Sequence, residues 1–113
     1  MASAPLLDVV VYHCQQATEK TLKGFLFWHD TMFRKTHDLV ELLNQCVAHD
    51  QTLIELSSTA QILTPFAHTF RYPGSLLEPP LEDAQDALAR AAAAYQVVVK
   101  CLPMEVSAFE IQT

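Results

Sequence analysis

Residues 12–23 read YHCQQATEKTLK and lie at the centre of a long helical pattern. Read outward in both directions, apolar and small side chains recur every three or four residues, the spacing that places them on one face of an α-helix. We expect this helix to run from about Ser3, a candidate N-cap with Pro5 in the opening turn, to near Trp28. Its predicted apolar face consists of Leu7, Val10, Cys14, Ala17, Thr21, Phe25 and Trp28.

Three more helices are predicted downstream. The first opens at Thr36, whose hydroxyl can cap the first turn, with Asp38 favouring the positive end of the helix dipole. The next spans about 52–70 and contains Pro65, which is expected to kink or split it. The last spans about 81–102, is rich in alanine and ends at Pro103. The predicted core residues of these helices include Leu39, Leu42, Leu43, Cys46, Leu53, Leu56, Ala60, Leu63, Leu81, Ala84, Leu88 and Val98.

The whole chain shows helical rather than alternating periodicity and has only two glycines. We therefore predict an all-α fold, an up-and-down antiparallel helical bundle of about four helices. A chain of 113 residues has room for one domain, here 1–113, with an irregular tail at 104–113. Apolar residues make up 50% and charged residues 18%, a balance that predicts apolar surface shared with another chain, by default in a homodimer.

Charge and cysteine usage narrow the possible functions. The formal net charge of -6 argues against a broad nucleic-acid surface, so no DNA partner is expected and any nucleotide or RNA contact must be local. The three cysteines are too scattered for a disulfide framework or a CxxC metal site, and His49 and His68 have no partner at metal-ligand spacing. The run 6–11, apolar except for Asp8, is too short to cross a bilayer. We predict a cytoplasmic protein without cofactor, metal or membrane contact.

Four polar residues of the quoted block are candidates for ligand binding. His13, Gln16, Lys20 and Lys23 recur at helical spacing, so their polar ends could converge on a phosphate or on an acidic group of a partner. The alternative is structural, because Glu19 and Lys23 are four residues apart and can form a surface ion pair.

Two further sites are predicted outside this helix. His37 stands at a predicted helix N-terminus beside basic residues, where an anion could bind, although ordinary capping is the simpler interpretation. Arg71 and Tyr72 precede Pro73 where the chain leaves a helix, and the guanidinium could reach the polar side of the first helix. The alternative for Arg71 is an interaction with the last free carbonyls of its own helix. His49 and His68 are interpreted as surface or packing residues.

The block 12–23 resembles the HEPN family (higher eukaryotes and prokaryotes nucleotide-binding domain), in which His, Gln-Gln, Glu-Lys and a second Lys recur along one helix. Two more blocks follow in the expected order, THDL at 36–39 and FRYP at 70–73. The resemblance implies an antiparallel helical bundle, often dimeric, of the prokaryotic type encoded beside a minimal nucleotidyltransferase. Many such pairs behave as toxin and antitoxin.

Other members of the family are ribonucleases that use an Arg followed four to six residues later by a His. This pair is missing here, because Arg34 precedes His37 by too little and no histidine follows Arg71 or Arg90. The family also usually carries one more amphipathic helix ahead of the His-Gln-Gln helix.

Three functions follow, in order of preference. The first is a non-catalytic subunit that binds a nucleotide or a nucleotidyltransferase partner through His13, Gln16, Lys20, Lys23, His37, Arg71 and Tyr72. The second is a metal-independent ribonuclease that uses His13 or His37 with Arg71. The third is a purely structural dimerisation module.

Overall fold

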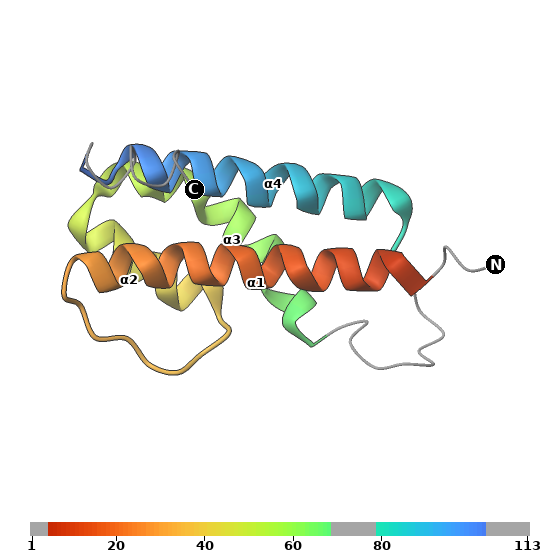
Figure 1. The fold of residues 1–113 in the computed structure, drawn as a ribbon, viewed down its shortest axis with the longest axis horizontal. Coiled ribbons are helices and arrows are strands. Elements are labelled where there is room, and N and C mark those ends of the chain that lie inside the picture. Colours follow the sequence, from red (N-terminus) through yellow and green to blue (C-terminus); the bar gives the residue numbers. More distant parts are fainter. Residues whose placement is uncertain (1–4, 69–78, 104–113) are drawn as a thin grey trace.

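The computed structural model describes residues 5–68 and 79–103, and both ranges consist of helices and short connections (Figure 1). In chain order these are α1 (Pro5–Trp28), α2 (Leu39–His49), η1 (Gln51–Leu56), α3 (Ser57–Leu63), η2 (Thr64–Ala67) and α4 (Leu81–Lys100), where η marks a 3-10 helix. The two described ranges contain no strand, so the predicted all-α helical bundle is confirmed. The predicted cap at Ser3, the predicted helix end at residue 70 and the tail 104–113 lie outside them.

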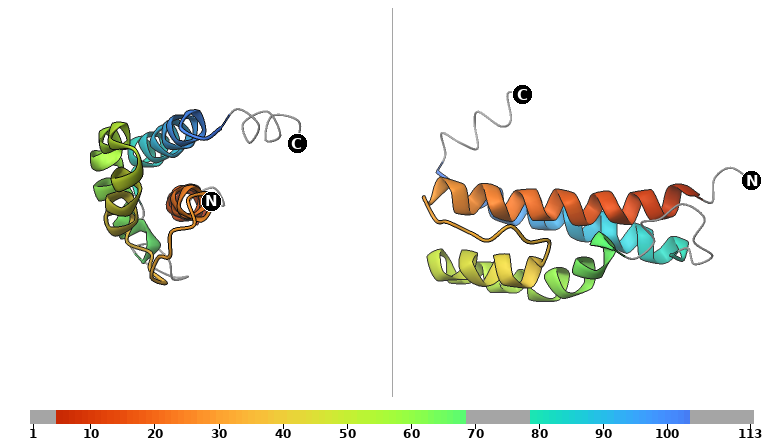
Figure 2. Two further views of the ribbon diagram at one scale, coloured as in Figure 1. Left: turned by 90° about the vertical axis from the view of Figure 1, so that its left-hand side faces the viewer. Right: turned by 90° about the horizontal axis from the view of Figure 1, so that it is seen from below.

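The chain direction departs from a simple up-and-down order. α1 and α4 lie side by side and point the same way (Figures 1 and 2). α2 also follows the direction of α1, because the connection 29–38 passes back along α1 before α2 begins. The carbonyl of His37 accepts a hydrogen bond from Gln15 near the middle of α1, whereas His49 at the end of α2 stacks on His29 just after α1. The segment from η1 to η2 runs the opposite way.

The core lies where α1 rests in the angle between α4 and the layer formed by α2 and α3 (Figure 2). Each large apolar side chain buried there contributes about 1.5–3 kcal/mol relative to its exposed state. The largest fully buried apolar side chains are Val11, Leu22, Phe25, Leu26, Leu39, Leu42, Leu53, Leu63 and Val98.

The buried face of α1 is rotated relative to the predicted one. Trp28, expected in the core, is half exposed, whereas Gln15, Thr18 and Glu19 are buried. Buried polar groups are tolerated when they are hydrogen-bonded, and these are. The Thr18 hydroxyl donates to the carbonyl of Cys14 at 2.9 Å, and the other two side chains join the network described below. Apolar periodicity alone could not identify this face because part of it is polar.

Asp38, and not Thr36, caps α2. The Asp38 carboxylate accepts from the backbone N–H groups of Val40 at 2.9 Å and Glu41 at 3.4 Å. The Thr36 hydroxyl instead accepts from the backbone N–H of Asp38 at 3.0 Å. A carboxylate at this position both satisfies free N–H groups and matches the positive end of the helix dipole, so Asp38 is the stronger cap.

The predicted third helix is divided into η1, α3 and η2. α3 ends at Leu63, and Pro65, which has no backbone N–H, lies in the first turn of η2. The predicted effect of Pro65 is thus confirmed. At the other end, Asp50 caps η1 by accepting from the backbone N–H of Thr52 at 3.0 Å.

α4 lies close to its predicted bounds but buries smaller side chains than expected. Ala84, Ala87, Ala94 and Val98 face the core, whereas Leu81 and Leu88 are exposed. Small residues allow close approach of a neighbouring helix, and α1 packs along α4. Within 5–68 and 79–103, no helix is both long enough and apolar enough to cross a bilayer.

The neighbours Leu53 and Ile54 provide a test of this core. Leu53 has no exposed surface, and Ile54 is 60% exposed. We expect Leu53→Ala to lower the free energy of unfolding by about 2–5 kcal/mol, because it removes buried methyl groups and leaves a cavity. Ile54→Ala, the matched control, should change it by less than about 1 kcal/mol. Urea denaturation followed by circular dichroism measures both, and equal losses would contradict this core.

Candidate functional site

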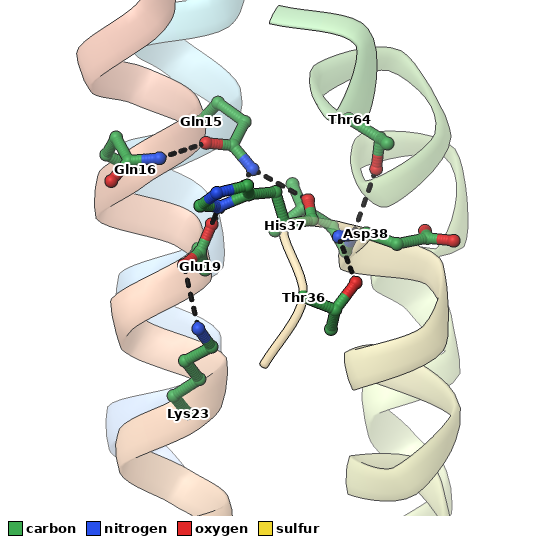
Figure 3. A network of polar contacts seen from close by, with 9 residues as sticks. Gln15, Gln16, Glu19, Lys23, Thr36, His37, Asp38 and Thr64 are labelled. Atoms are coloured by element: carbon green, nitrogen blue, oxygen red, sulfur yellow. Dashed lines mark hydrogen bonds and ion pairs between the residues drawn. The ribbon is translucent and has the colours of Figure 1, made fainter. Parts of the chain in front are cut away.

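A row of polar side chains on α1 faces the start of α2 (Figure 3). At its centre the Glu19 carboxylate accepts three hydrogen bonds. Oε1 accepts from Nδ1 of His37 at 2.8 Å and from Nε2 of Gln15 at 3.2 Å, and Oε2 accepts from Nζ of Lys23 at 2.9 Å. Only 7% of the Glu19 side chain is exposed. The predicted Glu19–Lys23 ion pair is therefore present, as one part of a larger buried network.

Gln15 joins α1 to the connection that precedes α2. Its Nε2 donates to the backbone carbonyl of His37 at 2.8 Å as well as to Glu19, and its Oε1 accepts from Gln16 at 2.7 Å. The side chain is fully buried, so these bonds replace the water that it loses on folding. Gln16 thus supports Gln15, and both glutamines hold the segment around His37 in place.

Lys23 connects the network with the middle of the same connection. Its Nζ lies 5.7 Å from the centre of the Phe33 ring in addition to its ion pair with Glu19. A cation over an aromatic face is attracted by the ring quadrupole. Further along, Arg34 forms two hydrogen bonds with Glu41, at 2.8 and 2.9 Å. The connection 29–38 is therefore tied to α1 at one side and to α2 at the other.

The charge of Glu19 is maintained despite its burial. Burial by itself would raise the pKa of Glu19, but the hydrogen bonds from Lys23, His37 and Gln15 outweigh it and lower the pKa below its usual value. The carboxylate is thus ionised at neutral pH and can only accept hydrogen bonds. Nδ1 of His37 must therefore carry the proton in the bond to Glu19.

This bond selects the tautomer of His37 and leaves Nε2 directed away from Glu19. The imidazole side chain is 51% exposed, and Nε2 has no hydrogen-bond partner among residues 5–68 and 79–103. A carboxylate behind an imidazole fixes its orientation and its tautomer. Nε2 can therefore accept a proton or a hydrogen bond from a ligand at the surface.

The predicted anion site at the N-terminus of α2 is not open to a ligand in this form. The Asp38 carboxylate already accepts from two of the free N–H groups of that turn, and Leu39 donates its N–H to Thr64 Oγ1 at 3.1 Å. Capping, the simpler interpretation, describes this helix start. The part of His37 that can contact a ligand is therefore its side chain.

Of the other predicted site residues, Gln16 and Lys23 lie in the same network as His37, and His13 and Lys20 do not. Lys23 and Gln16 are occupied within the network, and His13 and Lys20 lie on another face of α1, at two hollows beside α4. Arg71 and Tyr72 lie outside the described residues. Gln15 and Glu19 were not predicted as site residues, although the Gln-Gln and Glu-Lys pairs spaced four residues apart in the block 12–23 provided a signal for them.

Cys14 and Cys46 are not candidates for nucleophilic chemistry. Cys14 and Cys46 are buried free thiols, as predicted, and burial raises the pKa of Cys46 to about 12 and raises that of Cys14. Both therefore stay protonated and unreactive at neutral pH. Among the described residues, no three His, Cys, Asp or Glu side chains are placed to hold a metal ion.

The ionised state of Glu19 predicts a pH dependence of stability. Because the pKa of Glu19 is lower in the folded protein, its contribution is complete above the unfolded-state pKa of about 4.3 and is lost as pH falls through the lower folded-state value. We expect the free energy of unfolding of Glu19→Gln to fall less steeply than that of the wild type below about pH 4.3. At pH 7 the variant should be less stable by about 2 kcal/mol.

Urea denaturation of both proteins between about pH 3 and pH 7 checks this expectation. The pKa values of Glu41 and Asp50 are also lowered in the folded chain, but both groups are present in the two proteins and their effects cancel in the difference. Parallel pH profiles would show that Glu19 carries no charge-dependent stabilisation.

Comparison with known proteins identifies the family of this chain. The family model described as the HEPN domain matches residues 2–102, which is most of the chain. No match was found among curated proteins, and none among solved structures. The match covers all of the helices described above, including the polar network on α1. This chain belongs to the HEPN domain family.

Proposed function

We propose that this chain is a binding subunit that assembles with another chain through α1 and α4 and holds a nucleotide or a short RNA. The HEPN domain is a nucleotide-binding and ribonuclease-type domain. The observation that carries the proposal is an apolar groove along α1 and α4. An uncovered apolar surface of this kind is typical of an interaction site.

The groove consists of two adjoining hollows of about 490 and 290 Å³ that share Thr21 and Tyr95. Its lining residues extend from Val9 to Trp28 on α1 and from Leu88 to Leu102 at the end of α4. Figure 2 shows these two helices side by side. Ala17, Gly24 and Ala92 keep its floor open to a close helix. The exposed apolar residues along it are Val9, Phe27, Trp28 and Leu88.

The groove and the polar network use different faces of α1. Ala17 at the floor of the groove and Glu19 in the network are two residues apart, and two residues on an α-helix are about 200° apart around its axis. A chain bound in the groove would therefore leave His37 accessible. Assembly and ligand binding can occur at the same time.

A second copy of the chain is the proposed default occupant of the groove, which makes the protein a homodimer. The family resemblance adds a minimal nucleotidyltransferase as a heterologous partner, in a pair of the toxin–antitoxin type. Lys20 at the edge of the groove would favour an acidic side chain on either partner.

A ribonuclease is the second candidate function, and the contact between Glu19 and His37 favours it. A buried carboxylate that holds an exposed imidazole, whose Nε2 has no hydrogen-bond partner among residues 5–68 and 79–103, is the arrangement of a general base. This site would replace the missing Arg and His pair. The third possibility, a purely structural dimer, does not explain why His37 is held in this way.

The oligomeric state of the protein tests whether a second copy of the chain binds in the groove. We expect the wild-type protein to sediment with twice the chain mass of 12.6 kDa and Leu88→Arg to sediment as a monomer, because the charge would have to be buried in the groove. Leu88 is 55% exposed in the single chain, and Ile54→Arg is the matched control at 60% exposure outside the groove. A monomeric wild type at micromolar concentration would contradict the homodimer.

Isothermal titration tests ligand binding. We expect a mononucleotide panel or short single-stranded RNAs to bind the wild type and to bind His37→Ala at least about tenfold more weakly, since one hydrogen bond to a charged group contributes about 1.5–3 kcal/mol. His49→Ala, a substitution at another exposed imidazole, is the control. Lys20→Ala reports separately on binding at the groove. If none of the ligands gives a heat of binding, the proposal is restricted to protein partners.

A further inference from the structure

A second imidazole lies beside His37. The ring centres of His37 and His68 are 6.1 Å apart, and the ring planes meet at 77°. His68 is exposed and follows directly after η2. From the sequence it was interpreted as a surface or packing residue, because two histidines 31 positions apart give no signal of contact.

The position of His68 relative to His37 follows from the fold. The antiparallel arrangement of α2 and α3 brings η2 to the start of α2, where the backbone N–H of Leu39 donates to Thr64 Oγ1. Thr64 is also bonded to the carbonyl of Ala60 at 2.7 Å. His37 is held from the other side by Glu19 and Gln15. His37 thus lies just before α2 and His68 just after η2, where these two elements are hydrogen-bonded to each other.

We infer that His37 and His68 form a two-imidazole acid–base pair that cleaves the phosphodiester backbone of single-stranded RNA, with His37 as the base and His68 as the acid. The inference rests on the ribonuclease candidate above and adds the second catalytic residue and the role of each. His37 is the base because the bond to Glu19 places its proton on Nδ1 and leaves Nε2 free to accept one.

The separation of the two rings fits one phosphate. In an in-line displacement the attacking and leaving oxygens lie on opposite sides of phosphorus, and each needs a catalytic nitrogen at about 2.6–3.2 Å. Two imidazoles with centres 6.1 Å apart and steeply inclined planes can contact the two sides of one phosphate group. A single imidazole cannot reach both oxygens at once.

The bonds and protons of the cleavage step balance without a water molecule or a metal ion as a reactant. Nε2 of His37 takes the proton of the ribose 2′-hydroxyl, and the 2′-oxygen forms a bond to the adjacent phosphorus. The bond from phosphorus to the 5′-oxygen breaks, and protonated His68 gives its proton to that oxygen. The products are a 2′,3′-cyclic phosphate and a 5′-hydroxyl, and proton exchange with solvent restores both imidazoles.

Glu19 is a positioning residue in this scheme, because it acts through His37 and does not touch the RNA. Its negative charge stabilises the imidazolium that forms when His37 takes the proton, and Lys23 keeps Glu19 itself ionised. The chain carries a net charge of -6, so long-range attraction for RNA is weak and a short single-stranded substrate is expected.

Cleavage of a labelled single-stranded RNA tests the inference. We expect the wild type to produce 2′,3′-cyclic phosphate ends, and His37→Gln and His68→Gln each to lower kcat by about 10²–10⁴-fold, the usual contribution of general acid–base catalysis. The same oligonucleotide with 2′-O-methyl groups should not be cleaved. His49→Gln is the matched control at an imidazole outside the pair, and circular dichroism confirms that each variant is folded.

A substrate with sulfur in place of the bridging 5′-oxygen separates the two roles. A thiolate leaves without protonation, because thiols are far more acidic than alcohols. We therefore expect this substrate to restore cleavage by His68→Gln and not by His37→Gln. Glu19→Gln should lower kcat on both substrates with little change in KM.

The outcomes separate this inference from the proposed binding function. Binding of RNA by the wild type without cleavage would overturn the acid–base pair and leave the binding subunit in place. Cleavage that persists in His37→Gln or His68→Gln would also overturn it. If the wild type neither binds nor cleaves RNA, both RNA-based functions are overturned. The oligomer test of the groove stands independently of that result.

Discussion

The buried carboxylate of Glu19 is the interaction on which the arrangement of this bundle depends. It holds His37 and Gln15 on one oxygen and Lys23 on the other, at a place where only 7% of its side chain is exposed. A buried charge is costly unless its partners surround it, so the segment that carries His37 must return to the middle of α1. That return sets the parallel direction of α1 and α2, and through the hydrogen bond between Leu39 and Thr64 it also places η2 and His68.

α1 separates two kinds of surface. One face carries the polar network and ends in an exposed imidazole, and the opposite face opens into the apolar groove shared with α4. Such a division allows a subunit to bind another chain without covering its polar site. With 50% apolar residues and a core built largely from leucine and alanine, the chain also keeps large apolar side chains such as Phe27 and Leu88 at its surface.

The number and bounds of the helices follow from local chemistry, and most of them were predictable. Alanine content and Pro103 predicted α4 to within a few residues, and Pro65 predicted the division of the third helix. The errors have physical causes. Thr36 and Asp38 are both good N-cap residues, and only the geometry of the connection showed that the carboxylate takes that role. The core face of α1 was misplaced because Gln15, Thr18 and Glu19 are buried and satisfied there, and a hydrophobic pattern treats such residues as solvent-facing.

The all-α class, the family motifs and the presence of a polar row on the first helix are properties of the amino-acid order, because they depend on residues within a few positions of one another. The direction of the helices, the partners of that row and the pairing of His37 with His68 depend on contacts between residues 18 to 31 positions apart. Periodicity carries no information over such separations. Tertiary packing therefore decided that Glu19 and Gln15 form the centre of the network, that His13 and Lys20 belong to the groove instead, and that two ordinary surface histidines lie side by side.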